Sequence, residues 1–227
     1  MGRPSRYDND YASVTQITDQ GVHFDPTGWY EGKRAELKRK GVNLNKVNPI
    51  QECKKHKQNS IGIGHRIHAG IEKFVRGTSF DEAAATLKSN DERVMLSYLT
   101  NWCSEHKPTP VLMEKALYSH KYKFAGTPDM IATLKSGKSL VVVDWKTDGN
   151  PRTKQQDRER QAKYLWQAAG YSIAYQEEYG KKISTARFVR ASKDLKFAEY
   201  KFSAKELTEG RKEFLYLREI YRRVWGK

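Results

Sequence analysis

An aspartate and a lysine directly follow the most apolar run of the chain. Residues 140–143 are continuously apolar, which is typical of a strand buried on both faces, and Asp144, Trp145 and Lys146 come next. Residues two apart in a strand share a face, so Asp144 and Lys146 point to one side and Trp145 to the other. Burying this carboxylate and ammonium is costly unless they open into a cleft with partners. The pattern indicates a site, although a surface ion pair is the commoner origin of an Asp-x-Lys tripeptide.

A second acid is placed to join them. Asp129 follows a Gly126-Thr127-Pro128 bend and begins a strand, and a hairpin turn at residues 136–138 leads to the strand that ends in Asp144. The two carboxylates are therefore expected to lie close together, where they repel each other unless a cation sits between them. Mg²⁺ suits this pair because it is a hard ion that takes oxygen ligands and keeps several waters. Lys146 could hold or deprotonate such a water, which is the set of groups that metal-assisted attack on a phosphodiester requires.

The surrounding pattern predicts helices, then a run of strands, a helix, two strands and a closing helix. Residues 1–26 are expected to form a loosely structured arm docked through Tyr7, Tyr11 and Val14. Predicted helices cover residues 27–40, 49–58, 62–77, a stretch capped by Asp81, 157–179 and 204–224. Predicted strands cover residues 111–119, 122–125, 130–134, 140–145, 183–189 and 197–202. This order indicates an α/β fold with a mixed central β-sheet flanked by helices and an N-terminal helical extension. We expect a single domain overall, with residues 1–60 packed as an arm and helices on a core of residues 61–227.

The charge of the chain indicates a polyanionic partner. Its 227 residues carry 42 Lys and Arg against 27 Asp and Glu, a net charge of +15. A folded protein this basic usually meets nucleic acid, although solubility alone is the alternative; no basic amphipathic helix supports a membrane surface. No apolar run is long enough to span a membrane, and the N-terminus lacks the apolar core of a signal peptide, so we expect a bacterial cytoplasmic location.

Basic and aromatic side chains offer candidate contacts to nucleic acid. Arg152, Lys154 and Arg158 follow the candidate lysine in a polar stretch and are predicted to hold phosphates, with a solvated charge run as the ordinary alternative. Four aromatic residues could stack on the bases of a single strand, although core packing is commoner for such residues: Trp29, Tyr30, Trp102 and Trp166.

Several motifs, in this order, resemble those of the PD-(D/E)xK nuclease superfamily, and specifically its RecB-like exonuclease branch. Gly64 to Glu72 resembles the branch's helical signature, whose metal-binding histidine corresponds to His68. Other residues match the motifs of this family in type and order. Glu114 resembles a strand glutamate that supports the site, and Asp129 follows Pro128 as the family's metal-binding acid does. Asp144 and Lys146 resemble the D/E-x-K pair, and Gln167 with Tyr171 resembles the Q-x-x-x-Y element that touches DNA. The resemblance covers roughly residues 60–175, and Ser13-Val14-Thr15 adds an opening seen in phage-type exonucleases.

This resemblance implies a restriction-endonuclease-like core and a metal-dependent deoxyribonuclease. His68, Asp129, Asp144 and the carbonyl of Trp145 would bind one or two Mg²⁺ or Mn²⁺ ions, while Lys146 assists the attacking water. The implied activity is exonucleolytic, in phage-like DNA recombination, repair or replication, on single-stranded DNA or duplex ends and with a single-strand-binding or annealing protein as a possible partner. A site-specific or structure-specific endonuclease and a non-catalytic DNA-binding protein are the alternatives.

Two departures and several alternatives accompany the resemblance. Cys53 and Cys103 cannot supply the four-cysteine iron–sulfur cluster of some RecB-like nucleases, so the chain would belong to the cluster-free members. It carries no P-loop, so ATP-driven translocation would need a partner. His68 could instead be an interior helix histidine, with His65 as its rival, and Glu72 could orient the imidazole or face solvent. Gln167 and Tyr171 share a helix face, where a buried tyrosine is as good an interpretation as a DNA contact.

Overall fold

A five-stranded mixed sheet forms the centre of the computed structural model, which describes residues 10–21, 26–135, 137–148, 153–192, 194 and 196–226, without the side chains at positions 26, 28 and 29. The strand order is β2 (Thr109–Met113), β5 (Met130–Leu134), β6 (Gly137–Asp148), β7 (Thr185–Ser192) and β8 (Phe197–Phe202). β6 and β7 are parallel, and the other neighbouring pairs are antiparallel. The predicted α/β fold with a mixed central sheet is confirmed.

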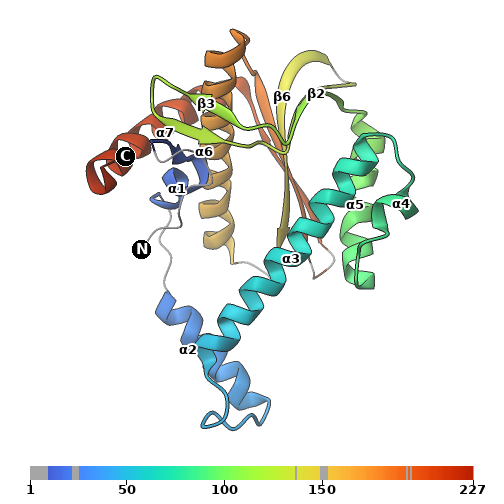
Figure 1. The fold of residues 1–227 in the computed structure, drawn as a ribbon, viewed down its shortest axis with the longest axis vertical. Coiled ribbons are helices and arrows are strands. Elements are labelled where there is room, and N and C mark those ends of the chain that lie inside the picture. The colour runs from blue at the N-terminus through green and yellow to red at the C-terminus, as the bar shows by residue number, and fades with distance from the viewer. Residues whose placement is uncertain are drawn as a thin grey trace.

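Helices cover both faces of this sheet (Figure 1). On one face lie α6 (Lys154–Tyr179), which makes the crossover between β6 and β7, and α7 (Ala204–Trp225). On the other lie α3 (Pro49–Val75), α4 (Phe80–Ala84) and α5 (Asn90–His106). The sheet therefore separates two apolar cores, and β6 contributes to both because its side chains alternate: Val142 packs under α6, whereas Val141 and Val143 pack under α3 and α5.

A second, smaller sheet contains the segment of the chain between β2 and β5. It has three strands in the order β1 (Ala12–Ser13), β4 (Phe124–Gly126) and β3 (Leu117–Ser119), with β1 parallel to β4. α1 (Val14–Asp19) follows β1 and is capped by Ser13. Ala12, Val14 and Ile17 are buried in the core under α6, so the predicted docking through Val14 is present, but the expected loose arm is wrong for residues 12–19. Tyr7 lies outside the described residues.

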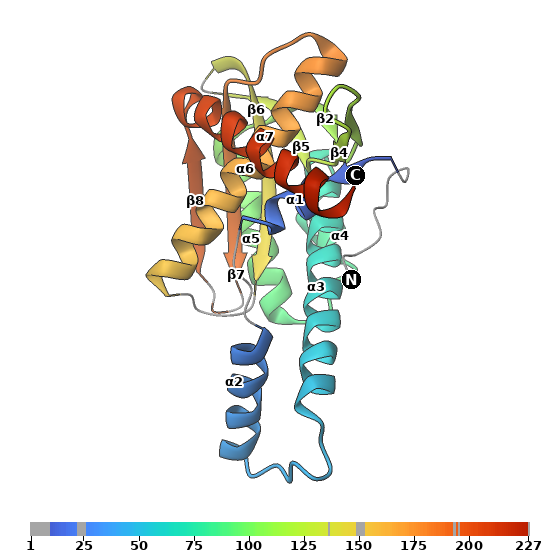
Figure 2. The same cartoon turned by 90° about the vertical axis from the view of Figure 1, so that its left-hand side faces the viewer.

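The helices predicted at residues 49–58 and 62–77 are one continuous helix, α3, of 27 residues. The sequence suggested a break because the apolar periodicity starts only at Gly62 and Ile63. The N-terminal half of α3 packs instead against α2 (Pro26–Arg39), and the two helices extend away from the sheet as a hairpin (Figures 1 and 2). An amphipathic pattern is therefore weak there although the helix persists.

Two other boundaries differ from expectation. The helix predicted to start at Asp81 is two helices, capped by Ser79 and Ser89 respectively, and Asp81 lies in the first turn of α4. The strand predicted over residues 111–119 is split between the two sheets as β2 and β3. Glu114, with φ of 49°, adopts a left-handed backbone conformation that ends β2 and turns the chain toward β3.

The remaining elements lie close to their predicted positions. The hairpin between β5 and β6 is present, although its Ser136 lies outside the described residues. α6 ends at Gly180, whose φ of 67° caps the helix. Within the described parts of the chain, no helix has the length and apolarity needed to cross a membrane.

Candidate active site

Asp144 and Lys146 lie in the second half of β6, on the face covered by α6. Trp145 between them packs in the opposite core, so the alternation expected from the sequence is present. Asp144 is only 3% exposed, and its Oδ2 forms an ion pair with Lys146 Nζ. Lys146 Nζ also lies 5.5 Å from the ring centroid of Tyr164 and 5.2 Å from that of Phe188. Strand β6 therefore presents an ion pair between a buried carboxylate and a partly exposed ammonium group, with aromatic rings beside the ammonium.

Asp129 connects this ion pair to the rest of the site. It lies between β4 and β5, and its Oδ2 accepts a hydrogen bond of 2.6 Å from the backbone N–H of Trp145. The bend before it needs a glycine, because a Cβ on Gly126 would lie 2.7 Å from both Tyr171 Cε1 and Val14 Cγ2. Packing against α6 and α1 thus fixes where the chain turns toward Asp129.

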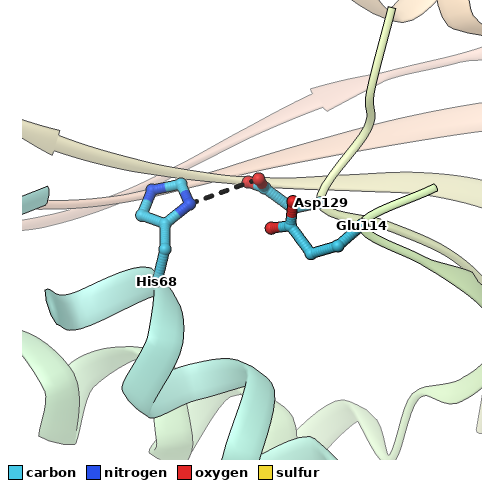
Figure 3. Close-up of side chains that lie close together, drawn as sticks. All are labelled: His68, Glu114 and Asp129. Atoms are coloured by element: carbon cyan, nitrogen blue, oxygen red, sulfur yellow. Dashed lines mark hydrogen bonds and ion pairs between the residues drawn. The ribbon is translucent and has the colours of Figure 1, made fainter. Parts of the chain in front are cut away.

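Glu114 reaches the site through the left-handed turn that ends β2. Its backbone N–H donates to the carbonyl oxygen of Asp129 at 3.1 Å, which ties the two residues together. A side-chain oxygen of Glu114, one of Asp129 and a ring nitrogen of His68 all lie within 4.8 Å of one another (Figure 3). Glu114 was predicted as a residue that supports catalysis, and the structure places it among the groups that could bind a cation.

His68 is brought to the two acids by the seating of α3 on the sheet. Its Nδ1 lies 3.2 Å from Asp129 Oδ1. One turn earlier, the position of a Cβ on Gly64 would be 3.1 Å from Thr147 Oγ1, so this glycine lets α3 approach β6 closely. Arg66 fixes the helix against α5 through a two-point ion pair with the buried carboxylate of Glu92, at 2.7 and 2.9 Å.

Two other polar residues of α3, His65 and Glu72, were considered as parts of the site, and both lie outside it. His65 is exposed and is not in the cluster of His68, Glu114 and Asp129. Glu72 accepts hydrogen bonds from Arg76 at 2.8 and 3.1 Å, an exposed i,i+4 pair. His68 is thus the histidine of α3 that the fold directs toward the acids.

Acids close to one another, Asp144 among them buried, determine the electrostatics of this site. Burial raises the pKa of Asp144, and the charge of Asp129 adds to this, so that its pKa is about 6 despite Lys146. Burial and the charge of Asp129 likewise raise the pKa of Glu114 to about 7. Burial alone would lower the pKa of His68 and of Lys146, but the neighbouring carboxylates outweigh it and raise both. The site therefore attracts positive charge.

The donor set suits a divalent cation. One imidazole nitrogen and two carboxylates within 4.8 Å of one another are ligands that Mg²⁺ and Mn²⁺ accept. Asp144 is not in this group, because its carboxylate faces Lys146, but it adjoins the group through the hydrogen bond between Trp145 and Asp129.

Helix α6 places Gln167 and Tyr171 in the interior. Tyr171 is 5% exposed and packs against Gly126, which favours the packing interpretation of this residue. Gln167 is also buried, and its Oε1 has no hydrogen-bond partner among the described residues. Tyr164, beside Lys146, was missed by the sequence analysis. The available signal was its spacing, since it lies three residues before Gln167 and seven before Tyr171 on the same helix face.

The predicted DNA-binding residues and aromatic candidates are scattered. Lys154 and Arg158 are exposed in the first turns of α6, which begins three residues earlier than predicted and so includes Lys154; Arg152 lies outside the described residues. Trp102 is buried and donates to Glu199 at 3.0 Å, so it is a core residue. Trp166 is half-buried and donates to Glu213 at 2.6 Å, and Tyr30 is half-buried. The side chain of Trp29 lies outside the described part of the structure.

Comparison with known proteins bears on this arrangement. A family model described as the PD-(D/E)XK nuclease superfamily matches residues 43–227 of the chain, a span that contains every residue of the cluster. No curated protein sequence gives a significant match.

Among solved structures, one from Eubacterium rectale described as a "Putative exonuclease" is similar with a TM-score of 0.50 and 13% identity, over 94% of this chain and 80% of that one. An alkaline exonuclease from Laribacter hongkongensis is similar with a TM-score of 0.37 and 10% identity, over 94% of this chain and 92% of that one. At these identities the first structure supports the fold and no more.

Proposed function

The chain belongs to the PD-(D/E)XK nuclease superfamily, and from this premise we propose that it is a Mg²⁺-dependent DNA exonuclease of the RecB-like branch. The observation that carries the proposal is that His68, Glu114 and Asp129 lie close together next to the ion pair of Asp144 and Lys146. Membership of the superfamily makes the chain a nuclease that acts on DNA with divalent metal ions. The identity of the ion, the exonucleolytic mode and the branch are the proposed parts.

We assign the metal to His68, Asp129 and Glu114, with Asp144 and the carbonyl of Trp145 next to them. A bound divalent ion would supply a water of lowered pKa and offset negative charge on the phosphate. The chain's own contribution is to hold these ligands in place: Asp129 is fixed by the N–H of Trp145 and by the backbone of Glu114, and His68 by the seating of α3.

The structure narrows the role that the sequence predicted for Lys146, which was to hold or to deprotonate a water. The carboxylates of Asp144 and Asp129 raise its pKa, so it is an ammonium group at neutral pH and a poor base. We therefore assign it the role of a proton and charge donor, which binds the nucleophilic water or a phosphate oxygen and stabilises the charge that develops there. Tyr164 and Phe188 position its side chain.

Residues outside the metal cluster supply further contacts to DNA in this proposal. Lys154 and Arg158 are exposed at the start of α6, the helix that follows β6, and we propose that they bind phosphates together with Arg152. Gln167 carries a buried Oε1 without a hydrogen-bond partner among the described residues, and it is therefore the member of the Q-x-x-x-Y pair that we propose contacts the substrate; Tyr171 packs against Gly126. A role in phage-like recombination, repair or replication, with a single-strand-binding or annealing protein as partner, rests on the resemblance alone.

A time course on end-labelled DNA tests the proposal. Linear and circular, single-stranded and duplex substrates are each incubated with Mg²⁺, Mn²⁺, Ca²⁺ or EDTA. We expect mononucleotides or short products from linear DNA in Mg²⁺ and Mn²⁺, and none in EDTA. Cutting of closed circles would replace the exonuclease by an endonuclease of the same fold, and no product from any substrate with any metal would favour a non-catalytic DNA-binding protein.

A further inference from the structure

The hairpin of α2 and the first half of α3 lies outside the two apolar cores of the sheet. We name this segment, residues 26–60, the basic arm, as distinct from the N-terminal residues 1–26. None of its described side chains belongs to either apolar core of the sheet. Within the arm only Leu37 and Cys53 are buried among the described residues, one from each helix. Figures 1 and 2 show it projecting from the body on the side where α6 begins. A segment that packs so little is explained better by what it binds than by what it supports.

Charge is concentrated in this arm. It carries nine Lys and Arg against three Glu, a net charge of +6 out of the +15 of the whole chain. Two of the glutamates are already engaged inside the arm: Glu36 with Lys33 and Lys40 at 3.0 and 2.7 Å, and Glu52 with Lys55 at 2.8 Å. Arg34, Lys38, Arg39, Lys46, Lys54 and Lys57 are exposed, and no carboxylate pairs with any of them within the described part of the chain.

Helix geometry aligns part of this charge with the candidate metal site. α3 runs without interruption from Pro49 to Val75 and carries both the arm and His68. Lys57 precedes His68 by eleven residues, about three turns, so it lies within about 20° of the same face and about 16 Å away along the axis. Lys54 lies about one turn further, roughly 21 Å from His68 and within about 40° of its face. Lys55 points to roughly the opposite side.

We infer that the basic arm binds the sugar–phosphate backbone of the DNA substrate, with Lys54 and Lys57 contacting phosphates on the side of the strand that leads away from the site. This inference rests on the proposed function for the identity of its ligand. At 3.4 Å per nucleotide step, the two lysines meet phosphates about five and six steps from the one at the metal site. Such contacts are sequence-independent and set affinity and register, not base specificity.

Charge and surface chemistry favour DNA over other partners for the arm. Ile50, 43% exposed, is the one large apolar side chain exposed among the arm's described residues. A membrane-binding helix presents a continuous apolar face below its lysines, and a protein interface has an apolar centre, and the described surface of the arm has neither.

The test compares two double variants of equal charge. Lys54→Ala with Lys57→Ala removes the unpaired lysines on the face of His68, and Lys40→Ala with Lys55→Ala removes two lysines that already pair with glutamates. Binding to a fluorescein-labelled duplex and to a single strand is followed by anisotropy in EDTA, over roughly 50 to 200 mM salt. Circular dichroism verifies that both proteins are folded.

We expect the first variant to lose about 1.8 from the slope of log K against log salt on duplex DNA, or about 1.4 on single strands, because each phosphate contact contributes about 0.9 or 0.7. Its affinity at the lower salt should fall roughly tenfold, and the second variant should resemble the wild type. Equal slopes for the two variants would overturn the inference.

Cleavage by the wild type in Mg²⁺ separates this inference from the proposed function. If the wild type cleaves while the two variants bind DNA alike, the arm assignment is wrong and the nuclease assignment stands. If the wild type never cleaves while only the first variant loses slope, the arm assignment stands and the nuclease assignment is wrong.

Discussion

Replacing Lys146 by methionine removes one charge from the centre of the site and little else. Methionine matches the length of the lysine side chain up to its ammonium group and can keep the contacts with Tyr164 and Phe188. What disappears is the ion pair with Asp144 and the positive charge available to a phosphate or a water. Any loss of activity can therefore be attributed to the ammonium group.

The expected loss is large because, in the role proposed for it, the ammonium group would lie beside the reacting phosphate in a partly dry site. A positioned proton or charge donor contributes about 10² to 10⁴ in rate, which corresponds to about 3 to 5 kcal/mol of transition-state stabilisation. We expect the single-turnover rate constant to fall by that factor, and the Kd for DNA in EDTA to change less than about threefold, because the lysine is one of many positive charges that attract the substrate.

The effect on stability should be much smaller than the usual cost of breaking a buried ion pair. Leaving one partner charged and unpaired costs about 3 to 5 kcal/mol. Asp144, however, already has a pKa of about 6 beside Lys146, and loss of the ammonium raises this pKa further, so the carboxyl binds a proton near neutral pH and escapes most of the penalty. The variant should remain folded at the temperature of the assay.

The assay is single-turnover cleavage of end-labelled DNA in Mg²⁺, with thermal unfolding and anisotropy as companions. Lys138→Met is the matched control, since Lys138 is an exposed lysine earlier in the same strand. It should retain wild-type kinetics. A Lys146→Met protein that folds, binds DNA and cleaves within about tenfold of the wild-type rate would refute the role given to this lysine.

Three further variants probe how the site is held. In Gly64→Ala the new Cβ would lie 3.1 Å from Thr147 Oγ1, so α3 should shift away from β6 by a few tenths of an ångström. The cleavage rate should then fall about tenfold, while the higher helix propensity of alanine raises Tm. Adding Thr147→Ala removes the close contact and should restore kcat. Arg66→Met should lower the free energy of unfolding by about 3 kcal/mol at neutral pH, because it leaves the buried carboxylate of Glu92 without its partner. Arg66 lowers the pKa of Glu92, so the stabilisation from this ion pair is present above about pH 4.5 and is lost as the pH falls through the folded-state pKa. Urea denaturation should therefore show a difference in stability between wild type and variant that shrinks in acid. Glu114→Gln should weaken Mn²⁺ binding at least about tenfold in calorimetry, and an unchanged affinity would remove this residue from the ligand set.

Local rules were sufficient for the parts of the site that lie on one strand. The apolar run before Asp144 and the period-two alternation predicted that Asp144 and Lys146 share a face, and the structure has them in one ion pair. The hairpin between β5 and β6 predicted that Asp129 and Asp144 lie near each other, and the N–H of Trp145 does reach Asp129. These outcomes follow from strand geometry within about twenty residues, which the sequence specifies directly.

Contacts between distant segments could not be derived in that way. β1 pairs with β4 across more than a hundred residues, and neither strand is long enough to show a period. Glu114 enters the cluster because a non-glycine residue adopts φ of 49°, a conformation that its sequence neighbours do not demand. The predicted separation of residues 49–58 from the rest of α3 was wrong for a related reason. A helix needs a wide apolar stripe only where it packs on a core, and this part of α3 packs on α2, outside both apolar cores of the sheet.

The distribution of charge explains how an acidic site can serve a basic protein. Glu114, Asp129 and Asp144 together repel a phosphate diester, and Lys146 is largely engaged by Asp144. A strand of DNA therefore gains nothing at the site from the chain's side chains alone, and a divalent ion among the carboxylates is what would make the approach of a phosphate favourable there. Attraction at longer range must come from elsewhere, and the unpaired lysines on the face of α3 that leads to His68 are in position to supply it. Removing the metal should then abolish cleavage while leaving most of the salt-dependent binding intact, and a parallel loss of both in EDTA would show that the site, not the arm, holds the DNA.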